Sequence, residues 1–136
     1  MRSIYVEPVR NRSLCPKASG MLTAQLTKKI QRSAALKLMP KDEAQTCLQI
    51  EIIEFSQKGS TFDSKDTSTI LSFDLRVKAE CTLMDKEGRY LWERRLVEEA
   101  LDLGKERNFH TLRDQAIAQL MERLARKIGA LLINIW

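Results

Sequence analysis

The residue types that most often carry chemistry are sparse in this chain of 136 residues. Its three cysteines, Cys15, Cys47 and Cys81, form no CxxC pair and have no histidine cluster beside them, so a metal site is not expected. Because the count is odd, at least one thiol stays free or bonds to another chain, and a Cys15–Cys47 bridge remains open in an oxidising compartment. His110 is the only histidine. With no partner fixed by the sequence, it receives no catalytic role.

The motifs of the common enzyme classes are also absent from the sequence. It contains no GxSxG, HExxH, Walker or GxGxxG motif. Gly104 and Lys105 are adjacent, but no glycine-rich phosphate loop precedes them. The carboxylates Glu93, Glu98 and Glu99 fit solvated strand positions. We therefore expect a protein that is not an enzyme and that needs neither a cofactor nor a metal.

Basic residues offer the more informative chemistry. Lys and Arg number 23 against 18 Asp and Glu, so the formal net charge is +5. A positive chain favours nucleic acid, anionic lipid headgroups or a phosphorylated glycolipid, although a solubilising surface charge is equally compatible. Arg76, Lys78 and Arg95 are expected to cluster on an exposed sheet face, where they could bind phosphate groups. The competing interpretation is that they pair with nearby carboxylates across the strands.

A long amphipathic strand must position these basic residues. From 71 to 83, apolar residues at the odd positions alternate with polar residues at the even positions. This period of two predicts a strand with one buried face and one solvated face. Residues 85–88 follow as a hairpin loop with Gly88 available for positive φ, and 90–101 return as the partner strand.

The register of this hairpin decides which side chains meet. A four-residue loop puts Trp92 and Leu96 in the core and Lys78 opposite Arg95. Arg94 then points inward near Ala79, which indicates that the register slips toward the strand end. The expected pairs are Leu83 with Tyr90, Cys81 with Trp92 and Val77 with Leu96.

The remaining patterns predict a single domain over 1–136. We expect a strand over 3–7, a helix capped by Ser19, a short extended piece over 36–39, a strand over 47–55, a polar loop over 57–65 and a second helix capped by Asn108. The stripe of Leu22, Leu26 and Ile30 marks the first helix and that of Leu112, Ala116, Leu120, Leu124 and Ile128 the second. The fold class is α+β: a two-layer sandwich with two helices on one face of a mixed, mainly antiparallel sheet of about four strands. The apolar C-terminus, 131–136, is expected to pack along the sheet edge or on the core, and the alternative is an exposed contact for a membrane-protein partner. No apolar stretch of the sequence is long enough to span a bilayer.

Nearly the whole chain can be compared with known families through a series of short segments. They are Ile4-Tyr5-Val6-Glu7-Pro8, Asn11-Arg12-Ser13, Leu22-Thr23-Ala24-Gln25-Leu26, Leu36-Lys37-Leu38, Glu43-Ala44, Leu48-Gln49-Ile50, the hairpin around Asp85 to Gly88, and Asp114-Gln115-Ala116-Ile117-Ala118-Gln119-Leu120. Their order and spacing resemble the LptE (RlpB) family of lipopolysaccharide-assembly outer-membrane lipoproteins.

The resemblance implies a lipid-anchored protein on the periplasmic side of the outer membrane. It would plug and support an LptD-like β-barrel and bind lipopolysaccharide (LPS), and its basic, polar sheet face would suit the phosphates of lipid A. The family's N-terminal signal and acylated cysteine are not found in this chain, and Arg12-Ser13-Leu14-Cys15 is not a lipobox. We therefore expect an anchor that was removed or that lies upstream of Met1.

Two other functions are compatible with the same patterns. The first is an accessory lipoprotein of another outer-membrane secretion or assembly system. The second is a double-stranded RNA-binding module, which also runs helix, three strands, helix. That module needs a lysine-rich start to its second helix, whereas Asn108 to Asp114 contains no lysine. We therefore expect no nucleic-acid partner.

Overall fold

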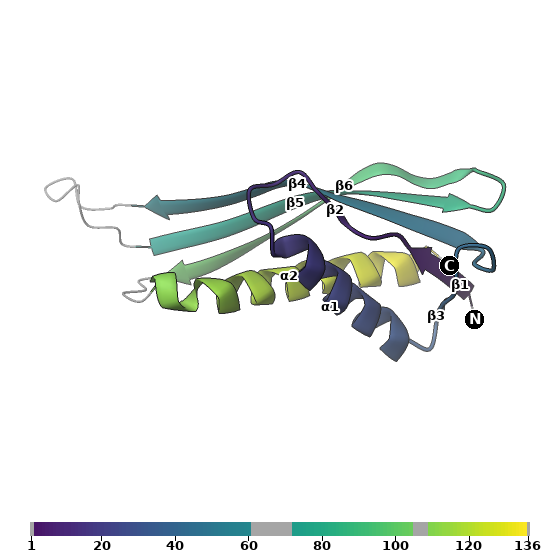
Figure 1. Ribbon diagram of the computed structural model, residues 1–136, viewed down its shortest axis with the longest axis horizontal. Helices are drawn as coiled ribbons and strands as arrows, with labels where there is room; N and C mark the ends of the chain where they lie inside the picture. The colour runs from purple at the N-terminus through teal and green to yellow at the C-terminus, as the bar shows by residue number, and fades with distance from the viewer. Residues whose placement is uncertain (1, 61–71, 105–108, 136) are drawn as a thin grey trace, which may run out of the picture.

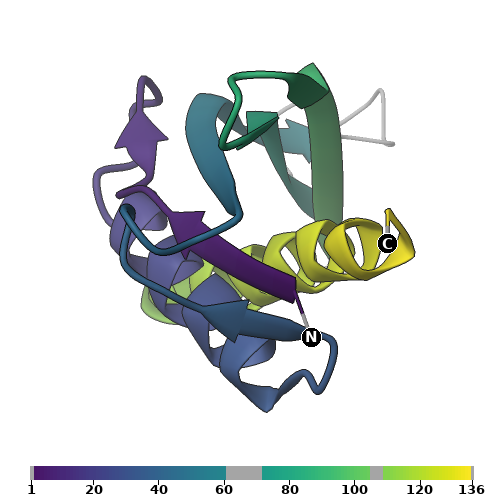
Figure 2. The ribbon, with the colours of Figure 1, turned by 90° about the vertical axis from the view of Figure 1, so that its right-hand side faces the viewer.

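The computed structural model describes residues 2–60, 72–104 and 109–135. Both helices lie on one side of a single sheet, so the molecule has two layers (Figures 1 and 2). This arrangement confirms the predicted α+β sandwich. The elements in chain order are β1 (Arg2–Val6), β2 (Arg10–Asn11), α1 (Ala18–Arg32), β3 (Leu36–Leu38), β4 (Thr46–Ser60), β5 (Ser72–Asp85), β6 (Tyr90–Gly104) and α2 (Phe109–Asn134).

The sheet is mixed and mainly antiparallel, as expected, but it has six strands. Its order is β3-β1-β4-β5-β6, and the short β2 pairs with β4 beside β1. β1 runs parallel to β3 and to β4, whereas β4, β5 and β6 form an antiparallel meander. The two extra strands are short segments with two and three residues. The extended piece predicted over 36–39 is confirmed as β3, whereas β2 is too brief to show an alternating pattern in the sequence.

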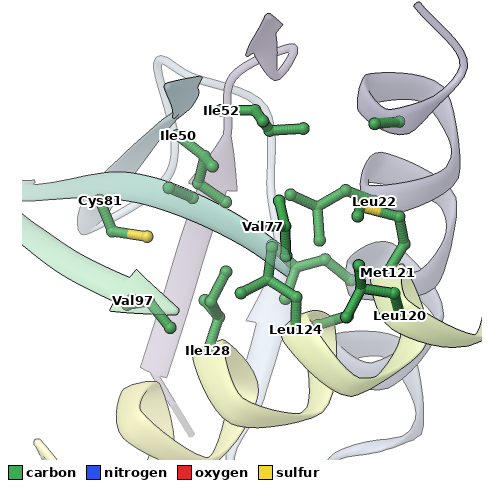
Figure 3. Close-up of a cluster of buried hydrophobic side chains, with 14 of the residues drawn as sticks. Leu22, Ile50, Ile52, Val77, Cys81, Val97, Leu120, Met121, Leu124 and Ile128 are labelled. Carbon is green, nitrogen blue, oxygen red and sulfur yellow. The ribbon is translucent and has the colours of Figure 1, made fainter. Parts of the chain in front are cut away.

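The core lies between the sheet and the helices (Figure 3). Leu22, Leu26 and Ile30 of α1 are almost fully buried, which confirms the predicted stripe. Leu120 and Leu124 of α2 are fully buried on the facing helix. The predicted Ser19 cap is wrong, because α1 begins at Ala18 and its N-cap residue makes no side-chain hydrogen bond. The predicted Asn108 cap and the contribution of Leu112 lie outside the residues whose side chains are described.

The buried side chains of β5 line the sheet side of this core. Leu75, Val77, Ala79, Cys81 and Leu83 are all buried with no exposed surface. The strand pairs with β4 from Thr46 through Ser60. The polar loop expected from residue 57 is therefore wrong for 57–60, which continue the strand, because long-range pairing with β5 supplies the backbone hydrogen bonds that local sequence cannot reveal.

The cysteines and the C-terminus complete the fold. All three cysteines are free, so the Cys15–Cys47 bridge is not formed. Cys15 and Cys81 belong to the core cluster, as expected for Cys81. Leu132 is buried and Ile135 packs against the core, in line with the expected packing of the C-terminal segment. Across the three described ranges, neither helix has the length and apolar character needed to cross a bilayer.

Candidate functional site

The register between β5 and β6 decides which basic residues can act together. Leu83 pairs with Trp92, whereas Cys81, two residues earlier in β5, pairs with Arg95, which lies three residues after Trp92 in β6. One additional residue of β6 is therefore accommodated as a β-bulge. Arg94 lies in it with φ of 47°, the only positive φ of a non-glycine residue in the described part of the chain. Its backbone N–H donates to Thr82 Oγ1 at 3.3 Å.

The bulge contradicts the predicted pairs. Lys78 lies opposite Glu98 and not opposite Arg95. Leu96 was expected in the core but is 50% exposed, whereas Trp92 is buried as expected. The predicted register is wrong from the hairpin onward, because Tyr90 pairs with Met84 and not with Leu83, and a first irregularity lies between Leu83 and Met84 before the bulge. The prediction assumed a regular ladder, whereas each additional residue on one strand moves the side chains beyond it to the other face.

Arg95 consequently lies on the side of the sheet that faces the helices. It is the partner of the buried Cys81, and its guanidinium carbon lies 5.2 Å from the centroid of the Trp92 ring. At this distance a cation over an indole face is attracted by the ring quadrupole. Because β6 is the edge strand, Arg95 stays exposed there. The structure therefore separates Arg95 from the other two predicted residues.

Arg76 and Lys78 share the opposite side of the sheet, which we call the outer face. Lys78 Nζ lies 3.7 Å from Glu54 Oε2 on β4, and Glu98 lies opposite it on β6. Lys78 is thus flanked by two carboxylates. Arg76 lies between Ser56 and Ala100 in the register and forms no ion pair with the residues that the structure describes.

The outer face carries mixed charge and is not the basic surface that the sequence suggested. Glu51 and Glu80 lie directly opposite each other, and Arg12 Nε meets Glu51 Oε1 at 2.8 Å. An anionic ligand on this face would therefore meet carboxylates beside each cation. The register places the following charged residues of β4, β5 and β6 on the outer face: Glu51, Glu54, Lys58, Asp74, Arg76, Lys78, Glu80, Glu98 and Asp102. Glu93 and Arg94 at the bulge border the same face beside Gln49 and Thr82.

Two basic residues of α2 have a role that the sequence analysis missed. Lys127 Nζ donates to the Glu98 carbonyl at 2.9 Å, and an Arg123 Nη donates to the Ala100 carbonyl at 3.3 Å. These carbonyls belong to the edge strand, where backbone groups are otherwise open to another chain. The four-residue spacing of Arg123 and Lys127 on a helix was the available signal.

The part of β6 next to the hairpin, residues 90–96, has no such hydrogen bond from α2 among the described residues, and it exposes apolar side chains. Tyr90, Leu91 and Leu96 are 56%, 41% and 50% exposed. Tyr90 and Leu96 share the outer face with Met84 and Glu80, their partners on β5. Large apolar side chains grouped at a sheet edge are typical of a surface that contacts another protein.

The pKa values of two thiols, Cys47 and Cys81, are raised. Burial raises the pKa of the Cys81 thiol to about 12, and the positive charge of Arg95 only partly offsets this. Burial, and then the charge of Glu7, raise the pKa of Cys47, whose Sγ lies 3.6 Å from Glu7 Oε1. A nucleophilic cysteine needs a lowered pKa, so neither thiol is activated. No group of three or more potential metal ligands occurs within the described ranges.

Comparisons with known proteins agree with this architecture. A solved structure of a hypothetical protein from Chlamydia trachomatis superposes with a TM-score of 0.70 at 12% identity, covering 98% of this chain and 96% of that one. A minor lipoprotein from Acinetobacter baumannii gives 0.66 at 14% identity, covering 98% and 93%. An uncharacterised lipoprotein from Nitrosomonas europaea gives 0.67 at 12% identity, covering 94% and 79%. At these identities the likeness shows a shared fold.

The sequence itself was compared with curated proteins and with family profiles. No curated protein matches it. The profile of the LptE family, described as lipopolysaccharide-assembly, matches residues 1–131. This match covers almost the whole described fold, from β1 into the last turns of α2. The chain therefore belongs to the LptE family of lipopolysaccharide-assembly proteins.

Proposed function

We propose that this protein is a non-enzymatic component of LPS assembly that binds LPS and serves as the plug and assembly partner of an LptD-like β-barrel. The observation that carries the proposal is the family match over residues 1–131. Under the proposal the protein is attached by an N-terminal lipid anchor to the periplasmic side of the outer membrane. The lipoproteins that share its fold support this location.

The outer face and residues 90–96 of β6 are the surfaces that fit a barrel partner. The outer face is polar along Arg76, Lys78 and Glu80, as a plug bordered by a water-filled lumen would require. Tyr90 and Leu96 add an apolar contact at its edge. On the helix side of β6, Trp92, Val97 and Leu101 are already packed in the core.

Co-purification tests the partner. The tagged protein is expressed in its host with a native lipoprotein signal, extracted in mild detergent and purified. We expect an LptD-like barrel in stoichiometric amount, and Leu96→Glu to reduce its yield, because a charge on the exposed apolar edge must be desolvated on binding. Leu14→Glu is the matched control, since Leu14 is 96% exposed and lies far from β6 in the chain. Reproducible recovery of a different barrel, or of none, contradicts the LptD assignment.

Arg76, Lys78 and Arg95 remain the proposed contacts for LPS phosphate, but their geometry calls for separate variants. Arg76→Glu with Lys78→Glu changes the outer face, and Arg95→Glu changes the edge beside Trp92. We expect each to weaken LPS binding, by about tenfold for the double variant if one charge-assisted contact is lost. Reversal at three exposed lysines away from these positions, Lys28, Lys37 and Lys86, controls for net charge. Unchanged LPS affinity in both the folded Arg76/Lys78 variant and the folded Arg95 variant rules out this set of contacts.

A second candidate function is an accessory role in another outer-membrane secretion or assembly system. It is favoured by the solved structures from A. baumannii and N. europaea, which share this fold and are named simply as lipoproteins. The same co-purification distinguishes the two functions, because the barrel that is recovered identifies the system.

A further inference from the structure

A groove opens between the end of α1 and the last turns of α2, in the helix layer and away from the outer face. Its volume is about 360 Å³, within the range of about 300 to 1,000 Å³ that small-molecule sites occupy. Three aliphatic side chains line the groove: Ile133 forms the open wall, whereas Ile30 and Leu36 are only 1% and 3% exposed. Ile133 is 43% exposed, so apolar surface remains in contact with water in the groove.

The close approach of the two helices shapes this groove. Gly129 lies in its wall, and a Cβ added at Gly129 would lie 3.9 Å from Lys29 Cβ. The helices therefore meet closely at this point. α1 then ends at Arg32, and the chain turns into β3 at Leu36. Next to Gly129, the exposed Ala130 carries only a small side chain, which leaves this part of the groove open.

Cationic side chains surround the apolar walls. Lys29, Arg32 and Arg126 all line the groove. The Glu122 carboxylate oxygen Oε1 lies 3.6 Å from Lys29 Nζ and 3.0 Å from Arg126 Nη2. Glu122 thus pairs with two of the three cations, so the groove keeps a net positive charge. Arg32 is exposed and makes no ion pair with any residue in the described ranges.

We propose that this groove binds an anionic amphiphile, with one alkyl chain against Ile30, Leu36 and Ile133 and a phosphate at Arg32 and Arg126. The guanidinium groups offer paired donors that match phosphate oxygens. The aliphatic parts of Lys29 and Arg32 extend the apolar surface next to the alkyl chain. Free phosphate or a neutral detergent would satisfy only one of these two features.

The proposal is independent of the proposed function, because it concerns the helix layer and requires neither the barrel nor LPS. The probe is dodecyl phosphate, added as monomer below its critical micelle concentration to the full chain labelled with nitrogen-15. Dodecyl maltoside and inorganic phosphate are titrated in parallel. We expect saturable amide shifts with dodecyl phosphate over 29–36 and 126–133, and at least about tenfold weaker binding of either comparison probe.

Two pairs of variants separate charge from shape. Arg32→Gln with Arg126→Gln removes the phosphate contacts, and Lys86→Gln with Arg89→Gln removes the same charge from the exposed β5–β6 loop. Only the first pair is expected to weaken dodecyl phosphate binding, by about tenfold or more.

Ala130→Trp fills the groove without changing its charge, and Ala24→Trp adds the same side chain at an exposed position of α1. Only Ala130→Trp is expected to abolish saturable binding. Equal binding of dodecyl maltoside would overturn the phosphate contact, and equal binding of inorganic phosphate would overturn the alkyl site. Shifts spread over the molecule, or unaffected binding in the Arg32/Arg126 variant, would overturn the groove itself. Failure to bind LPS, with the groove intact, would contradict only the proposed function.

Discussion

Replacing glycine by alanine at three positions tests the backbone and the helix crossing directly. Gly129 lies in the buried interior of α2, Gly20 lies exposed in the first turn of α1, and Gly88 lies in the β5–β6 loop with φ of 83°. The chemical change is the same at each site. The sign of its effect depends only on the local conformation and on the space that the added methyl group enters.

At Gly129 we expect alanine to raise the free energy of unfolding. The gain in helix propensity is about 0.8 to 1.0 kcal/mol in a helix interior. The added Cβ would lie 3.9 Å from Lys29 Cβ, which is ordinary van der Waals contact, so no clash offsets the gain. Gly20 has no atom within 4 Å of an added Cβ. It therefore reports propensity alone, with an expected gain of about 0.5 to 1 kcal/mol.

At Gly88 the sign reverses. A left-handed conformation costs a residue with a Cβ roughly 1 to 2 kcal/mol, and nothing around Gly88 could compensate, since no atom lies within 4 Å of the added Cβ. Urea unfolding followed by far-ultraviolet circular dichroism measures all three variants, and unchanged m-values show that each effect is on stability. A loss of more than about 1 kcal/mol in Gly129→Ala would refute the helix crossing, because overpacking of that size requires a closer approach.

Three further predictions follow from the core, the sheet edge and the thiols. Leu124→Ala should lower the free energy of unfolding by about 2 to 5 kcal/mol, because Leu124 is fully buried. Leu91→Ala, at a position that is 41% exposed, is the control. An equally small loss for both variants in urea unfolding would contradict the burial of Leu124. Arg123→Met with Lys127→Met should increase self-association in sedimentation velocity, since it frees the Ala100 and Glu98 carbonyls of β6; a monomer at every concentration would refute a protective role. The free energy of unfolding should fall as pH rises from about 9 toward 12, because the pKa of Cys81 is raised to about 12 from 9.0 and the unfolded chain loses its proton first. Cys81→Ala should flatten that fall in alkaline unfolding curves, and an unchanged slope would exclude Cys81 as its source.

Sequence patterns predicted the positions of the candidate-site residues less well than they predicted the fold. Arg76 and Lys78 occupy the predicted face because both lie on one strand, where alternation fixes the side of each residue. Arg95 lies on the next strand, and its side depends on the bulge near Arg94, which no alternating pattern announces. The groove residues Lys29 and Arg126 come from helices distant in the chain. Their proximity depends on how closely the helices pack.

Residue patterns alone predict the elements with long periodic stretches, and along β5 and α1 they also predict which side each residue faces. The thirteen positions from 71 to 83 could satisfy one buried face only as a strand, and the stripe of α1 could do so only as a helix. Three features depend on the folded arrangement: the extension of β4 to Ser60, the pairing of β6 after its bulge and the contacts of α2 with the sheet edge. They could not be predicted because periodicity is local, whereas register, edge protection and helix crossing depend on contacts between segments far apart in the chain.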